Sequence, residues 1–175
     1  MDEGRIKNMA LAINMFNNLL IKATGGLSTQ FVERAADVEN AVKGAFNTFD
    51  GKDLYPEYSD KAAHIAYTII HDHPFYDGNK RTGILAYLVF MAAHCEYYSY
   101  NEDFLVAAAI KVAEGEWSES EFNNMMKMHM SETHKMTMAF SSAIASKIDC
   151  CYWPAVEMLA NAFISYYIGV FEELA

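Results

Sequence analysis

Apolar residues recur at helical spacing along almost the whole chain, and this pattern constrains the fold more than any other feature. Gly25 and Gly26 follow the first apolar face and are expected to end that helix, because glycine is favoured at helix C-termini. No segment of alternating apolar and polar residues is comparable, so the predicted fold class is all-α. The predicted helices cover about residues 6–24, 31–49, 56–71 (with Ser59 as the alternative start), 79–92 and 101–113.

Two local signals refine these boundaries. Asp50-Gly51 is typical of a tight turn, so a small hairpin or loop is expected over residues 49–56. Pro74 disfavours helical backbone at the residue before it, and the third helix is therefore expected to stop before His73.

The C-terminal third is also predicted to be helical. Ser118 precedes Glu121 by three residues, which is the spacing of a capping box and predicts the start of a sixth helix. Residues 123–175 are rich in Met, Ala and aromatic residues, and two more helices are expected there, broken near residues 150–154. One face of the last predicted helix carries Val156, Leu159, Phe163, Tyr166 or Tyr167, and Val170.

The stretch from Met158 to Phe171 carries no charge and has 14 residues. A helix that spans a bilayer needs about 20 apolar residues, so this stretch is typical of a buried helix. No membrane partner is expected.

The 175 residues include 23 acidic and 13 basic side chains, which gives a formal net charge of −10. A protein that coats DNA or RNA needs a basic face, so no nucleic-acid partner is expected. With 53% hydrophobic residues, the chain can bury the core of one domain. Cys95, Cys150 and Cys151 suggest no disulfide framework, and the N-terminus shows no signal-peptide pattern. We therefore expect a reduced, cytoplasmic setting.

The segment HDHPFYDGNKRTGI concentrates the reactive side chains. Unpaired N–H groups at a helix N-terminus favour an anion such as phosphate, and Gly78 allows the backbone to approach it closely. Lys80 and Arg81 add positive charge. Asp77 offers a hard oxygen ligand for Mg²⁺, which accompanies nucleotide phosphates. His73 can accept a proton near neutral pH, so the segment predicts a site for phosphoryl chemistry.

The run from His73 to Arg81, HPFYDGNKR, resembles the motif HxFx(D/E)GN(G/K)R of the Fic/Doc family at every position. The wider sequence resembles the Doc (death-on-curing) branch of that family. Three segments carry this second likeness: Gly25-Gly26 before the second helix, residues 49–56 before the motif helix, and the turn at residues 114–118.

This resemblance covers about residues 6–122 and implies a fold. Residues 1–122 would form the helical Fic/Doc core, and residues 123–175 would be a C-terminal helical extension packed on the same domain. Residues 50–54 would form a flap that holds an extended target segment by strand pairing.

The resemblance also implies a reaction, the attachment of part of a nucleotide to a hydroxyl group of a target protein. The co-substrate would be ATP or another nucleoside triphosphate, with Asp77 holding Mg²⁺. His73 would be the catalytic general base, and Phe75 would anchor the loop in the core. The nucleotide phosphates would be bound by Gly78, Asn79, Lys80 and Arg81.

Two sequence differences from adenylylating Fic enzymes bear on which part of the nucleotide is transferred. Those enzymes usually have Gly in place of Lys80 and a second Arg in place of Ile84. The Doc branch shares the lysine and transfers phosphate from a nucleotide bound in the reverse direction. We therefore expect phosphoryl transfer from ATP by a Doc-like toxin. The alternatives are AMP transfer (AMPylation) and a catalytically silent Fic-fold binding module.

The resemblance also bears on regulation and partners. Many Fic enzymes carry an inhibitory helix with the pattern (S/T)xxxE(G/N), and the closest match here is Thr29 to Glu33, with Arg34 at the Gly/Asn position. Inhibition by a separate antitoxin is therefore expected. The partner of the reaction would be a target protein, a translation factor by analogy, and the sequence leaves open whether the chain forms a homo-oligomer.

Two other residue groups have structural explanations. His71 and His73 flank Asp72, but a structural zinc site needs four ligands and no further ligand is evident nearby. A methionine cluster is expected to fill irregular gaps in a helical core. Its members are Met125, Met126, Met128, Met130, Met136 and Met138.

Overall fold

The computed structural model describes residues 2–27, 35–94, 98–130 and 153–175. In chain order the elements are α1 (Glu3–Thr24), α2 (Ala35–Ala45), β1 (Thr48–Phe49), β2 (Lys52–Asp53), α3 (Tyr58–Asp72), α4 (Asn79–Ala93), α5 (Glu102–Ala113), α6 (Glu119–Met128), α8 (Trp153–Tyr166) and α9 (Ile168–Glu173). Helices dominate this part of the chain, and the sheet is a short two-stranded hairpin, which confirms the predicted all-α class.

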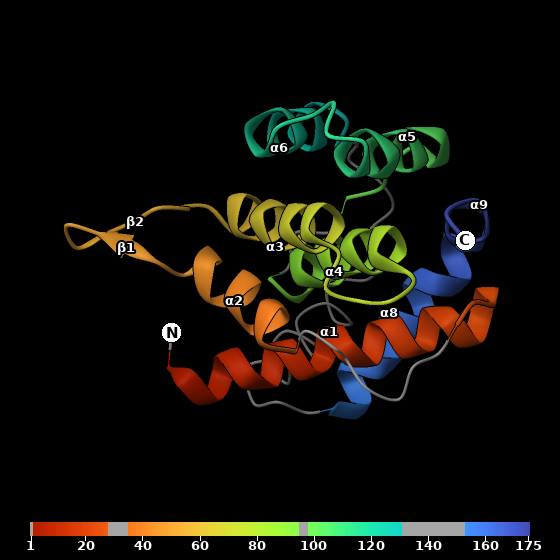
Figure 1. Ribbon diagram of the computed structural model, residues 1–175, viewed down its shortest axis with the longest axis horizontal. Coiled ribbons are helices and arrows are strands. Elements are labelled where there is room, and N and C mark those ends of the chain that lie inside the picture. Colours follow the sequence, from red (N-terminus) through yellow and green to blue (C-terminus); the bar gives the residue numbers. More distant parts are fainter. Residues whose placement is uncertain (1, 28–34, 95–97, 131–152) are drawn as a thin grey trace.

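An antiparallel pair, α3 and α4, forms the centre of the molecule (Figure 1). Tyr58 at the start of α3 stacks on His94 after the end of α4, with ring centroids 3.9 Å apart. Helices α1 and α8 pack against α4, α2 packs against α1 and α3, and α5 and α6 cover the other side of α3. Because α4 is surrounded, nearly all of its side chains are buried in the main hydrophobic core.

The predicted helix ends are confirmed where their local signals are strongest. Gly25 caps α1 with a φ of 80°. Asn101 caps α5 by accepting a hydrogen bond from the Phe104 N–H at 3.0 Å. Ser118 and Glu121 form the expected capping box at the start of α6. Each signal acts within a few residues, which is why it could be recognised without tertiary information.

The expected hairpin forms at the N-terminal end of α3. Thr48 pairs with Asp53, and Asp50 and Gly51 adopt positive φ angles of 51° and 73° at the turn. The predicted extension of the second helix to residue 49 is wrong. That helix, α2, ends at residue 45, and Phe49 lies in β1 with 76% of its surface exposed. Turn chemistry here outweighs the helical spacing.

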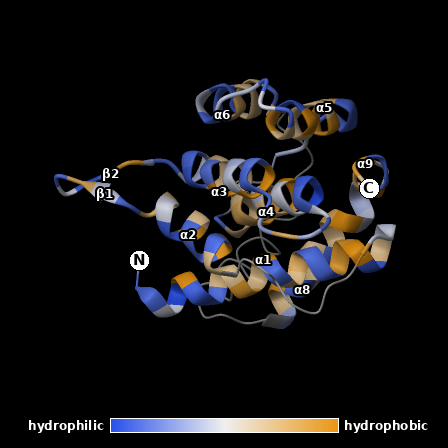
Figure 2. Ribbon diagram, viewed as in Figure 1, coloured by the Kyte–Doolittle hydropathy of each residue, from blue (hydrophilic) through white to orange (hydrophobic). Residues whose placement is uncertain are grey.

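The hairpin projects from the helical body at the end of α3 opposite the motif loop (Figures 1 and 2). Because α3 has 15 residues, its length of about 22 Å separates the two. The flap role implied for residues 50–54 therefore has no geometric support in this arrangement.

In the C-terminal segment, Tyr167 and not Tyr166 is the buried member of the predicted pair. Tyr167 is fully buried and separates α8 from α9, whereas Tyr166 is exposed. Helix α8 packs against α1 and α4, and α9 packs against α1 and α5. In the described ranges, no helix combines the length and apolarity that crossing a membrane requires.

Several predicted features lie outside the described residues. They are the Thr29 to Glu33 pattern, the three cysteines, Met136 and Met138. Within the described part of the methionine cluster, Met126 is buried in the core and Met130 packs against it, as expected, while Met128 is exposed.

Candidate active site

The motif loop connects the end of α3 to the start of α4. His73 caps α3 in the left-handed conformation, with φ 50° and ψ 60°, and its side chain is exposed. Phe75 is buried in the main core, which confirms its expected anchoring role. The loop is therefore anchored in the core by Phe75 and exposes the His73 side chain to solvent.

The Asn79 side chain fastens this loop to itself. Its Oδ1 accepts the Phe75 N–H at 2.8 Å, and its Nδ2 donates to the Phe75 carbonyl oxygen at 2.8 Å. Both bonds are buried. The amide group is thus engaged within the protein, and what Asn79 offers to a ligand is its backbone N–H.

The N-terminus of α4 lacks a side-chain cap. Gly78 is the N-cap residue, with φ 82° and ψ 15°, and no side chain bonds the first turn from this position. The first backbone bond of the helix runs from the Thr82 N–H to the Gly78 carbonyl at 2.8 Å. The N–H groups of residues 79–81 precede that bond, so they and the helix dipole are oriented to receive an anion.

Arg81 is the most deeply buried cation of the site, with 0% of its side chain exposed. Its Nη1 donates to the Thr24 Oγ1 at 2.6 Å and to the Gly25 carbonyl at 2.9 Å. Its Nη2 donates to the Asp77 Oδ1 at 2.9 Å. Its Nε is buried without a hydrogen-bond partner in the described structure. The guanidinium thus joins the end of α1 to the motif loop.

The Asp77 carboxylate is held from two sides and still reaches the surface. Oδ1 accepts from Arg81, and Oδ2 accepts from the Leu27 N–H at 3.0 Å. The side chain is 29% exposed. A Cβ on Gly26 would lie 2.5 Å from Oδ2, so only glycine permits the chain to pass this closely.

This donor set fits a magnesium ion that arrives with a nucleotide. Mg²⁺ is commonly bound by one or two carboxylates together with substrate phosphates, and each Asp77 oxygen retains a lone pair. Over the described ranges, no group of three or more His, Cys, Asp or Glu residues could hold a metal ion by itself.

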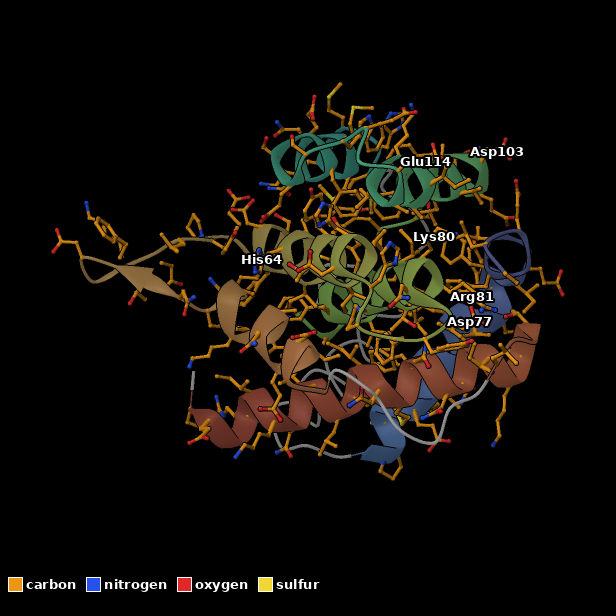
Figure 3. The ribbon with its side chains drawn as sticks, in the orientation of Figure 1. His64, Asp77, Lys80, Arg81, Asp103 and Glu114 are labelled. Carbon is orange, nitrogen blue, oxygen red and sulfur yellow. The ribbon has the colours of Figure 1, made fainter. Side chains whose placement is uncertain are left out.

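The cations and the carboxylate gather at one end of the α3–α4 pair. Figure 3 shows Asp77, Lys80 and Arg81 together there, and His64 at the other end. Lys80 is half-buried and makes no hydrogen bond or ion pair with another described residue. Because it follows the N-cap by two positions, it adds an available positive charge to the open N–H groups.

Helix α1 contributes residues that the sequence did not reveal. The Asn17 Nδ2 donates to the Asp77 carbonyl at 2.8 Å and lies 3.1 Å from the Thr82 Oγ1. Thr24 accepts from Arg81, as described above. These partners are 57–65 residues apart in the chain, so no local pattern could have identified them.

A second polar cluster surrounds the base of the hairpin. His64 Nδ1 and the Glu119 carboxylate are 2.9 Å apart, and this hydrogen bond lowers the pKa of Glu119. Burial and the same carboxylate raise the pKa of Tyr55, whose ring packs on His64. Burial opposes ionisation of Asp60, but its bonds to Lys127 and other donors outweigh that effect and lower its pKa. This cluster joins α3 to α6, far from the motif.

Comparison with known proteins agrees with the geometry of the motif end. Residues 10–91 match the model of the Fic/DOC family. The matched range runs from α1 to α4, so it includes the motif loop, Asn17 and Thr24. The match supports the family without assigning the Doc branch; members of this family are typically transferases, and the family suggests nucleotide-dependent modification of proteins in general. No curated protein and no solved structure matches the chain.

Proposed function

We propose that this chain is a member of the Fic/DOC family and that it transfers the γ-phosphoryl group of ATP to a hydroxyl group on a target protein. The observation that carries the proposal is the uncapped N-terminus of α4 beside an exposed edge of Asp77. The N–H groups of residues 79–81 and the ammonium group of Lys80 would bind the transferred phosphate. His73, exposed on the same loop, would be the general base.

In this reaction His73 accepts the proton of the target hydroxyl group. The hydroxyl oxygen forms a bond to the γ-phosphorus, the bond from that phosphorus to its bridging oxygen breaks, and ADP leaves. Asp77 would hold Mg²⁺, which neutralises phosphate charge when it is bound. Arg81 would keep the Asp77 carboxylate in place, since its Nη2 already bonds to it.

The surroundings of Ile84 favour phosphoryl transfer over AMP transfer. Ile84 is fully buried in the main core, one turn after the site. A second arginine, usual at this position in adenylylating Fic enzymes, has no counterpart here. Lys80 in place of glycine adds bulk and charge to the cradle, as in the Doc branch. AMP transfer stays the second candidate, because the base and the open helix N-terminus would serve it equally.

The partners follow from the proposed reaction. The substrate would be a target protein in the cytoplasm, a translation factor by analogy with Doc toxins, and a separate antitoxin would inhibit the enzyme. These assignments rest on the resemblance to the Doc branch.

The test is to incubate the protein and a cell lysate with ATP labelled at either the α- or the γ-phosphate. We expect γ-label on protein, and a decrease of about 10²- to 10⁴-fold in the variant His73→Asn. Asparagine is suitable because it tolerates the left-handed backbone of this position. His71→Asn, two residues earlier and also exposed, is the matched control and should retain activity.

Transfer of the α-label instead would overturn phosphoryl transfer in favour of AMP transfer. If neither label is transferred, and His73→Asn is as harmful to cells as the wild type, the chain is a silent binding module.

A further inference from the structure

One amide group of α1 touches both sides of the open helix N-terminus. The Asn17 Nδ2 donates to the Asp77 carbonyl oxygen at 2.8 Å, immediately before Gly78. The same nitrogen is 3.1 Å from the Thr82 Oγ1, on the residue that makes the first backbone bond of α4. The three open N–H groups lie between these two attachment points.

The close approach of this amide depends on Gly78. A Cβ at that position would lie 2.9 Å from the Asn17 Nδ2 and 3.3 Å from the Ile21 side chain. Glycine therefore serves two purposes here. It adopts the positive φ of the N-cap, and it leaves the space through which α1 reaches the loop.

The two acceptors of the Asn17 amide both belong to the proposed phosphate site. Asp77 carries the carboxylate that would hold Mg²⁺, and its carbonyl belongs to the peptide that leads into the N-cap. A hydrogen bond to this carbonyl fixes the orientation of that peptide, and the bond to Thr82 fixes the first turn. Displacement of a reacting group by about 1 Å can lower a rate by about 10²-fold.

We propose that Asn17 is a positioning residue for the phosphate cradle of α4, an assignment that rests on the proposed function for its catalytic consequence. It acts through the Asp77 carbonyl and Thr82 and does not itself touch the nucleotide. The family motif lies wholly within residues 73–81, so this assignment extends the site to a second helix.

The test compares Asn17→Ala with Asn18→Ala. Asn18 is the neighbouring residue on α1, and its amide bonds only within its own helix, to the Asn14 carbonyl, so it is the matched control. In Asn17→Ala we expect the Thr82 amide hydrogen to exchange at least 10-fold faster, because the bond to Gly78 is less well held. Binding of inorganic tripolyphosphate should weaken about 10-fold. Both quantities should stay at wild-type values in Asn18→Ala.

Kinetics give the second readout. The kcat for label transfer should fall about 10²-fold in Asn17→Ala, while the KM for the target protein stays unchanged. Asn17→Asp, which keeps the shape and loses the donor, should behave like Asn17→Ala. Thr82→Ser, which keeps the hydroxyl group, should retain most of the activity.

These readouts separate the two proposals. If the wild type transfers no label, the proposed function fails, whereas faster Thr82 exchange with weaker tripolyphosphate binding still supports the positioning role. Unchanged exchange or unchanged tripolyphosphate affinity in Asn17→Ala overturns the positioning role.

Discussion

The N-termini of α3 and α4 lie at opposite ends of one antiparallel helix pair, and their backbone donors have different partners. At α3, Glu57 and Asp60 form a capping box in which the Glu57 N–H donates to the Asp60 Oδ2 at 3.3 Å, so side chains of the protein itself cap this end. At α4, the N-cap is a glycine without a side-chain bond, so the first N–H groups receive no cap from it. The two ends show how one helix pair can be closed for stability at one terminus and open for a ligand at the other.

The cations at the two ends of the helix pair also differ, in their burial and in their bonding partners. Arg81 is fully buried and donates to α1 and to the motif loop. Lys127 at the hairpin end is 31% exposed and pairs with Asp60 and Glu57 at 2.6 and 2.9 Å. The buried cation organises the site, whereas the partly exposed cation joins α6 to α3.

The largest expected effect comes from removing the buried cation. Arg81→Met should lower the free energy of unfolding by about 3–5 kcal/mol, because it leaves the Asp77 carboxylate without its charged partner. Lys127→Met should cost less, about 1 kcal/mol, because its ion pairs are partly open to solvent, where such pairs contribute little. Urea unfolding of both variants measures the difference. Equal losses would show that burial does not distinguish the two ends.

The next effect concerns the two glycines that follow α1. Gly26→Ala should lower the free energy of unfolding by about 2–3 kcal/mol, since its Cβ would lie 2.5 Å from the Asp77 Oδ2 at a φ of 129°. Gly25→Ala should cost about 1–2 kcal/mol, because its φ is also positive but nothing lies within 4 Å of the new Cβ. A smaller loss for Gly26→Ala than for Gly25→Ala would contradict the close approach.

A third comparison tests the closed type of helix N-terminus. Ser118→Ala removes the cap of α6 and should lower the free energy of unfolding by about 1 kcal/mol. Label transfer should be unaffected, because this N-terminus has no place in the proposed site. Thermal unfolding and the label assay measure the two quantities, and a loss of transfer without a loss of stability would be inconsistent with a purely structural cap.

The smallest effect is expected in how the free energy of unfolding depends on acid pH, through Asp60 and Lys127 at the hairpin end. Hydrogen bonds from Lys127 and Asn123 outweigh burial and hold the pKa of Asp60 below its usual value of 3.8. A lowered folded-state pKa adds stability above pH 3.8, which is lost as the pH falls through the folded pKa. The stability difference between wild type and Lys127→Met should therefore shrink between pH 5 and pH 2.5. A constant difference in urea unfolding over that range would exclude this contribution.

Local sequence predicts the backbone of the motif end well. Pro74 accounts for the end of α3 and Gly78 for the start of α4. Each of these depends on one residue and its immediate neighbours, so no knowledge of packing was needed. The burial of Phe75 was an expectation from the family resemblance.

The remaining features depend on which helices pack together. The guanidinium of Arg81 was expected to contact phosphates, but its donors reach Thr24 and Gly25 across 56–57 residues of sequence. The Asn17 contact is of the same kind. The position of the Asp50 turn at the end of α3 opposite the motif loop did follow from the sequence, because the predicted helix over residues 56–71 lies between the two.

The most direct test of the account follows the backbone amide resonances of nitrogen-15-labelled protein during titration with magnesium and a non-hydrolysable ATP analogue. The account predicts saturable shifts at the N–H groups of residues 79–81 and none at residues 58–60, whose helix end is closed by its capping box. Shifts at both helix ends, or at residues 58–60 alone, would contradict the claim that the open N-terminus of α4 is the nucleotide site.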